Sequence, residues 1–217
     1  MNVRGSFSPK LRVRIKDNNS SPYVPLPSSN ILGNLDGKYL VKLNSFLVPV
    51  LQSSSRSRFV KCWRAKTDGW AGFTFHSNCD GKGPTVTIIK VGSYIFGGYT
   101  DISWSSSYCG YASSSKSFIY SLYNINGYAP VKLQVKSGEQ SRAIYSCSHN
   151  GPIFGAGLDI HVSNNAAGNQ NSHTWCGQTY RLPPGYYSSL SSCSFYAGGG
   201  SYAFAPSDVE VFYETTT

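Results

Sequence analysis

The sequence predicts a single β-rich α+β domain in which antiparallel strands form a sandwich-like core with a few short flanking helices. Many short runs of β-branched and aromatic residues alternate with turn residues, as expected of strands. Only 13 % of the 217 residues are charged, whereas Ser, Gly and Tyr are abundant, a composition typical of strand-and-turn proteins. This length suits one domain with a short arm.

The first 29 residues are expected to form an arm or linker, and residues 30–217 the compact domain. Residues 11–15 alternate in the manner of a strand, and the following segment contains Pro22, Pro25 and Pro27 among Ser and Asn. Prolines at this density favour an extended connector over a packed element.

The first element of the domain is predicted to be an amphipathic helix. Apolar side chains recur at helical spacing, and Pro49 should end or kink the helix because proline has no backbone N–H to donate. The apolar positions are Leu40, Leu43, Phe46, Leu47 and Leu51.

Residues 58–64 are predicted to form a strand, after which Asp68 could cap a short helix that runs to Cys79. Residues 85–100 predict a β-hairpin, since two strand-like runs are broken at Gly92-Ser93. The Gly97-Gly98 pair in the second run indicates a bulge or a close backbone approach. Further strands are expected within residues 117–124, 130–135, 142–147, 158–162 and 208–214, and loops around 103–116 and 162–177.

The charge balance favours acidic partners without selecting one. A formal net charge of +9 and a pI near 9.3 raise encounter rates with polyanions. The basic residues are scattered, and no motif for sequence-specific nucleic-acid binding occurs, so we expect no such partner. No apolar run reaches the ~18–20 residues that span a bilayer, and the first 16 residues lack the apolar stretch of a secretion signal.

The cysteines indicate an oxidising compartment. Their number is even, which fits three disulfides with fifteen possible connectivities. Sequons at Asn18 and Asn19 offer glycosylation sites. We therefore expect an extracellular, secreted or cell-surface protein, with a cytoplasmic location as the alternative. The disulfide candidates are Cys62, Cys79, Cys109, Cys147, Cys176 and Cys193.

Several segments resemble the TLDc domain family. The residues that carry the resemblance are the aromatic-rich stretch and hairpin at 69–104, the strand at 117–124, the Gly-rich run at 151–163 and the closing Val-Glu-Val-aromatic strand at 208–214. The resemblance covers residues 30–214. The family commonly has Gly-x-Gly-Glu before its core strand, but residues 113–116 read Ser-Ser-Ser-Lys here, so that Glu is absent.

The resemblance implies a two-sheet antiparallel β-sandwich with flanking helices and no established catalytic residues. For intracellular family members it implies oxidation resistance or regulation of the vacuolar proton pump, which is our alternative function. The cysteines and the Ser/Asn-rich loop resemble those of extracellular TLDc modules from cnidarians and other invertebrates, and we place the chain nearest to these.

Two His-x-x-Cys pairs are the only pattern that suggests a metal site. His76 and Cys79 together with His173 and Cys176 would give a Cys₂His₂ zinc site if the fold brought them together. The six cysteines can instead pair with one another, so we expect neither zinc nor another cofactor. A metal-dependent enzyme that uses these pairs is the second alternative.

No catalytic signature favours a conventional enzyme. Asp159 and His161 lie two residues apart and are interpreted as outward polar positions of a strand. Neither a G-x-S-x-G motif, nor a P-loop, nor a dinucleotide fingerprint occurs.

Aromatic residues in the predicted loops are the best candidates for binding a partner. Exposed Trp and Tyr beside Ser, Asn and Gln are typical of protein or glycan contacts. We therefore expect a non-catalytic, disulfide-stabilised binding module. The expected contacts are Trp104, Tyr111, Trp175 and Tyr187.

Overall fold

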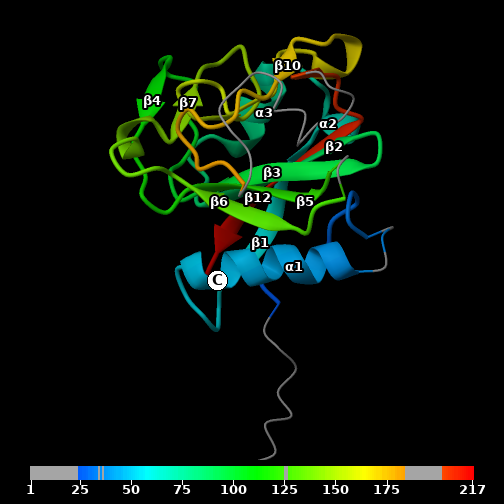
Figure 1. Ribbon diagram of the computed structural model, residues 1–217, viewed down its shortest axis with the longest axis vertical. Helices are drawn as coiled ribbons and strands as arrows, with labels where there is room; N and C mark the ends of the chain where they lie inside the picture. Colours follow the sequence, from blue (N-terminus) through cyan, green and yellow to red (C-terminus); the bar gives the residue numbers. More distant parts are fainter. Residues whose placement is uncertain (1–23, 34, 36, 125–126, 184–201) are drawn as a thin grey trace, which may run out of the picture.

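Two six-stranded antiparallel sheets pack face to face in the computed structural model, which describes residues 24–33, 35, 37–124, 127–183 and 202–217 (Figure 1). The sequence prediction of a β-rich α+β sandwich is therefore confirmed. The expected strand at 11–15 lies outside the described residues.

The first sheet contains the longer strands and lies at the centre of the molecule. One face of this sheet packs against helix α1 and the other against the second sheet. On β2, for example, Val86 and Ile88 belong to the core on the α1 side, whereas Ile89 belongs to the core between the sheets. Successive side chains of a strand point to opposite faces, so one strand serves two cores. The order is β1 (Arg58–Arg64), β12 (Asp208–Thr215), β2 (Thr85–Val91), β3 (Tyr94–Thr100), β5 (Phe118–Tyr123) and β6 (Val131–Gln134).

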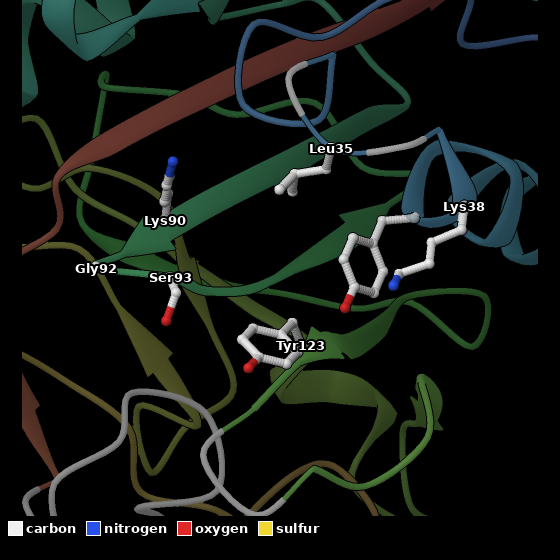
Figure 2. Close-up of a pocket in the computed structure, with 7 residues that line it drawn as sticks. Leu35, Lys38, Lys90, Gly92, Ser93 and Tyr123 are labelled. Carbon is white, nitrogen blue, oxygen red and sulfur yellow. The ribbon is translucent and has the colours of Figure 1, made fainter.

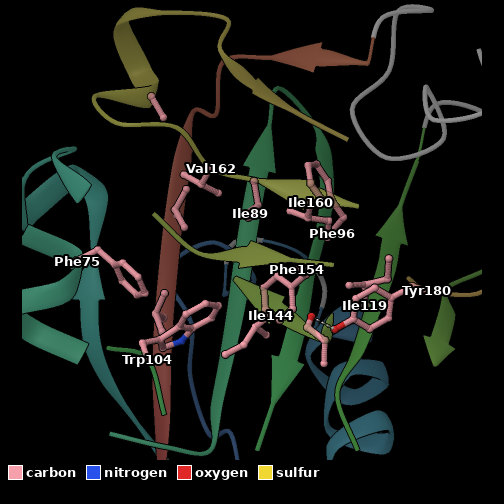
Figure 3. Close-up of a cluster of buried hydrophobic side chains, with 14 of the residues drawn as sticks. Phe75, Ile89, Phe96, Trp104, Ile119, Ile144, Phe154, Ile160, Val162 and Tyr180 are labelled. Carbon is pink, nitrogen blue, oxygen red and sulfur yellow. Dashed lines mark hydrogen bonds between the residues drawn. The ribbon is translucent and has the colours of Figure 1, made fainter. Parts of the chain in front are cut away.

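The second sheet is built from short strands joined by longer loops. Its strands contribute Ile144, Phe154 and Ile160 to the core between the sheets (Figure 3). Because the strands have two or three residues each, the loops between them form much of the surface on this side. The order is β11 (Ala203–Phe204), β10 (Ser172–His173), β9 (Ile160–His161), β8 (Ile153–Phe154), β7 (Ile144–Ser146) and β4 (Gly110–Ala112).

The predicted amphipathic helix is present as α1 (Lys38–Leu47), and a 3₁₀ turn, η1 (Val48–Val50), follows it. Leu43 and Leu47 are buried against the first sheet. Helix α1 lies on the face of this sheet opposite the second sheet (Figure 1). The regular helix ends before Pro49, as the missing N–H of proline requires. Short 3₁₀ turns also occur at η2 (Gln140–Arg142) and η3 (Ala166–Gly168).

The expected cap at Asp68 is corrected by the structure. Asp68 is the last residue of a four-residue helix, α2 (Ala65–Asp68), and its carboxylate accepts the backbone N–H of Arg64. The following helix, α3 (Gly72–Cys79), begins after Ala71, and Asn164 Oδ1 accepts the backbone N–H of Gly72. The chain turns at Gly69, whose φ of +104° suits glycine, so the predicted helix begins at Gly72 instead of directly after Asp68, and α2 is a short helix that was not predicted.

The β2–β3 hairpin has the predicted turn and a close approach at both glycines. A Cβ on Gly97 would lie 2.0 Å from the carbonyl oxygen of Thr87, and one on Gly98 would lie 2.6 Å from the Phe154 ring. The pairing of β3 with β5 shifts register between Ile95 and Phe96, and the extra residue there is Leu122 of β5. The glycine pair therefore provides close packing, and the bulge lies next to it.

Two disulfides link elements across the fold. Cys62 of β1 is bonded to Cys79 at the end of α3, and Cys109 is bonded to Cys147 beside the β4–β7 pair. These bonds resolve two of the pairings that the sequence left open. Cys176 is buried, whereas Cys193 lies outside the described residues.

Candidate binding surface

The four expected aromatic contacts have different environments, and the expectation for Trp104 is corrected by the structure. Its side chain is 1 % exposed and lies between Phe75 and Phe154 in the core (Figure 3). The indole N–H donates to Thr85 Oγ1 at 2.9 Å, which satisfies its one polar group. Trp104 therefore stabilises the sandwich, although serine residues surround it in the sequence.

Tyr111 lies on β4, at one edge of the second sheet, and Tyr187 lies outside the described residues. The Tyr111 ring is 4.9 Å from that of Tyr145, its partner across β7, and remains half exposed. Its hydroxyl makes a long 3.4 Å contact with the carbonyl oxygen of Ala156. Tyr111 thus lies at the β4 edge of the second sheet, whereas Trp175 follows β10 near the opposite edge.

Trp175 is exposed and belongs to a cluster at the other end of this sheet. Its ring is 5.5 Å from the His173 ring and 6.0 Å from the Tyr202 ring, and it is 40 % exposed, with Tyr202 at 41 %. Antiparallel pairing of β10 with β11 places Tyr202 beside His173. We call Trp175, Tyr202 and His173 the aromatic platform.

Tyr202 was absent from the sequence-based candidates. It stands next to a two-residue strand after a long Gly/Ser-rich segment, so no local period distinguishes it from other tyrosines. Only the pairing of β10 with β11 identifies it as a partner of Trp175.

His161 borders the aromatic platform and pairs with His173 across strands β9 and β10. The two Nδ1 atoms are 3.3 Å apart, and His161 Nε2 lies 3.1 Å from Asn150 Oδ1. Burial, and to a smaller extent the neighbouring His173, lowers the pKa of His161 to about 4. His161 is therefore neutral at physiological pH.

A buried carboxylate holds the chain beyond Trp175. Asp159 is fully buried and accepts backbone N–H groups from Gln178, Thr179 and Tyr180 at 3.2, 2.9 and 3.3 Å. Desolvation raises its pKa to about 6, although these hydrogen bonds act in the opposite direction. The prediction that Asp159 points outward was wrong, since it anchors residues 177–180.

The loop before Trp175 is held by its own polar side chains. Ser172 Oγ accepts the backbone N–H of Ser163 at 3.0 Å, and Asn169 Oδ1 accepts from Ser163 Oγ and from the N–H of Asn171. Asn169 also donates its amide to the carbonyl oxygens of Asn164 and Asn165. These bonds order the Ser/Asn-rich segment, which the sequence predicted only as a loop.

The four residues of the suggested zinc site are not assembled. Cys79 is bonded to Cys62, so its sulfur is not a thiolate. His76 is buried on α3, where its Nδ1 lies 2.6 Å from Asp80 Oδ1 and its Nε2 lies 3.0 Å from the carbonyl oxygen of Cys147. Within the described part of the chain, no group of three or more His, Cys, Asp or Glu side chains could hold a metal ion.

A basic pocket of about 720 Å³ forms a second surface feature (Figure 2). It lies where the start of α1 meets the β2–β3 turn and the end of β5, and Lys38 and Lys90 contribute ammonium groups. The Tyr123 ring stacks on that of Tyr94 at 5.9 Å and contacts that of Tyr39 at 6.1 Å. Such a lining suits an anionic group.

Two further features concern the glycosylation sequons and membrane spans. Sequons Asn18 and Asn19 lie outside the described residues. No helix of the described segments is long and apolar enough to cross a membrane.

Comparison with known proteins agrees with the resemblance noted in the sequence. The family model of the TLDc domain matches residues 29–214, which include every helix and nearly every strand position described above. No curated protein matches the chain. Because the matched region spans most of its length, this chain belongs to the TLDc domain family.

Proposed function

We propose that this protein is an extracellular, non-catalytic binding module that recognises a glycan through the aromatic platform. The observation that carries the proposal is the exposure of Trp175 and Tyr202, two large rings set 6.0 Å apart and inclined by 61°. Each ring keeps about two fifths of its surface in water. Exposed aromatic pairs of this kind are typical of recognition sites.

The surroundings of the platform favour a glycan over a protein partner. His173 and the exposed Asn171 place polar groups beside the rings, which suits a sugar with one face of C–H groups and a rim of hydroxyls. A stable protein interface usually buries about 800 Å² on each partner and has an apolar centre. Two half-exposed rings among polar side chains suit a smaller ligand better.

The covalent structure supports an extracellular location. Cys62–Cys79 and Cys109–Cys147 are both disulfides, and such bonds persist in oxidising compartments, whereas the cytosol reduces them. The alternative of an intracellular oxidation-resistance protein or proton-pump regulator would require the reduced chain to remain folded.

The charge of the protein supports an acidic glycan. The formal net charge of the protein is +9, so its overall field attracts polyanions. Sulfate or carboxylate groups on the glycan would gain from this field, more strongly at low ionic strength.

A glycan array probed with the labelled protein in chelator-containing buffer tests the proposal. We expect binding to acidic glycans, with about a tenfold or larger loss of affinity for Trp175→Ala and Tyr202→Ala. Phe73→Ala is the matched control, because Phe73 is 74 % exposed on α3, outside the platform. Affinity unaffected by the platform variants, or a partner that proves to be a protein without sugar, would overturn the glycan assignment.

A further inference from the structure

Two imidazole rings face each other at the edge of the aromatic platform. His161 and His173 occupy paired positions on β9 and β10, and their Nδ1 atoms are 3.3 Å apart, whereas their ring centroids are 4.7 Å apart. The nitrogens are closer than the ring centres, so they lie on the sides of the rings that face each other. We propose that these two Nδ1 atoms bind a divalent transition-metal ion.

The separation of the nitrogens matches the geometry of such an ion. Zinc binds imidazole nitrogen at about 2.0–2.1 Å, and a tetrahedral angle then places two ligand nitrogens about 3.3 Å apart. The same 3.3 Å spacing also satisfies a hydrogen bond between the two rings, so the pair accommodates either the direct contact or a bridging ion.

Asn150 sets the orientation of the first imidazole. Its Oδ1 can only accept, so the 3.1 Å contact requires His161 Nε2 to carry the proton. The lone pair of the neutral ring is then on Nδ1, which faces His173. Histidine ligands in metal sites are commonly held by a hydrogen bond at the other ring nitrogen in this way.

A carbonyl oxygen that can serve as a metal ligand lies beside the imidazole of His173. The carbonyl oxygen of Asn171 lies 3.0 Å from His173 Nδ1, so in the metal-free protein this nitrogen carries a proton that it donates to Asn171. When the ion binds, the Nδ1–H bond of His173 breaks and a metal–nitrogen bond forms. Solvent takes up that proton, and the Asn171 oxygen, which no longer accepts a hydrogen bond, becomes free to join the ion.

The three metal ligands favour divalent ions of the late first-row metals. Two imidazole nitrogens with a carbonyl oxygen suit Cu²⁺, Ni²⁺ and Zn²⁺, and affinity should be highest for Cu²⁺ in the usual series. Ca²⁺ and Mg²⁺ prefer sets of oxygen ligands rich in carboxylates, which this site lacks among the described residues. The metal site shares His173 with the aromatic platform but needs neither Trp175 nor Tyr202, so metal binding that survives Trp175→Ala and Tyr202→Ala distinguishes the two proposals.

Copper titration of the purified protein, followed by electron paramagnetic resonance, tests the inference. We expect one equivalent of Cu²⁺ with two imidazole nitrogens as ligands, and an about tenfold or larger loss of affinity in His161→Ala and in His173→Ala. His149→Ala is the matched control, since His149 is exposed and its Nδ1 contacts Ser148 Oγ rather than either imidazole of the pair. An unchanged nitrogen count in either site variant would overturn the proposal.

A second measurement avoids any dependence on how the variants fold. Zn²⁺ is added to the unmodified protein with ¹⁵N-labelled histidine, and the side-chain resonances of all four histidines are followed. The signals of His161 and His173 should shift together at the first equivalent, while those of His76 and His149 stay in place. The absence of a joint shift, or an earlier shift of His149, would contradict the site.

Discussion

The hydroxyl of Tyr120 on β5 donates to the carbonyl oxygen of Thr87 on β2 at 2.7 Å, passing over Gly97 of the strand between them. The bond skips one strand of the sheet, which is feasible only because Gly97 has no side chain there. Glycine at this position therefore permits both the hydrogen bond and the packing of Tyr120.

Gly97→Ala should destabilise the fold by about 3 kcal/mol or more, because the new Cβ would lie 2.0 Å from backbone oxygen, which cannot rotate away. Urea unfolding followed by tryptophan fluorescence measures the change. Gly168→Ala is the control, since a Cβ added there would have no neighbour within 4 Å, and it should change stability by less than about 0.5 kcal/mol. Equal stability of the two variants would refute this account of Gly97.

Glu210→Gln should cost about 3 kcal/mol of stability. The buried carboxylate lies 2.6 Å from Lys61 Nζ and accepts from Ser29 Oγ and the N–H of Asn30 at 2.5 and 3.1 Å. Lys61 is 30 % exposed and stays hydrated, so the loss comes from the charge-assisted hydrogen bonds that the fully buried carboxylate accepts. Thermal or urea denaturation near neutral pH checks the value.

The matched change for that experiment is Glu139→Gln. Glu139 pairs with Arg142 at 2.9 Å, but neither side chain is buried, since Glu139 is 29 % and Arg142 49 % exposed, so its loss should cost less than about 1 kcal/mol. A Glu210 variant as stable as the Glu139 variant would show that the carboxylate does not anchor the chain before α1.

The two disulfides should contribute separately to stability. In the chain-entropy model, a bond across 17 residues contributes about 3 kcal/mol and one across 38 residues about 4 kcal/mol. The double replacements Cys62→Ser/Cys79→Ser and Cys109→Ser/Cys147→Ser, compared by denaturant unfolding, measure each contribution. Peptide mapping without reduction should recover both linkages, and a different pairing would contradict the structure.

Truncation of Trp104 should destabilise the fold far more than truncation of Trp175. Trp104→Ala removes a fully packed core side chain and should cost about 3–5 kcal/mol, whereas Trp175→Ala should cost less than about 1 kcal/mol because Trp175 is partly exposed. Differential scanning calorimetry of both variants provides the comparison. A larger loss of stability for Trp175→Ala than for Trp104→Ala would contradict the assignment of Trp104 to the core and of Trp175 to the surface.

Sequence periodicity was sufficient for the elements whose signal is local. The β2–β3 hairpin follows from two strand-like runs around Gly92-Ser93, and α1 follows from leucines at helical spacing before Pro49. Both patterns reflect how one element exposes one face and buries the other, which a short window of sequence contains. The even number of cysteines likewise indicated disulfides.

What remained undetermined depends on packing between residues far apart in the chain. Trp104 and Trp175 both stand among small polar residues, and only the meeting of the two sheets buries the first and leaves the second exposed. Cysteine pairing and the approach of His161 to His173 depend in the same way on which strands become neighbours. Local patterns were enough for the longer strands, the first helix and the family resemblance. Which side chains meet was settled in three dimensions, because non-local packing and hydrogen bonding select one arrangement among many that share the same local patterns.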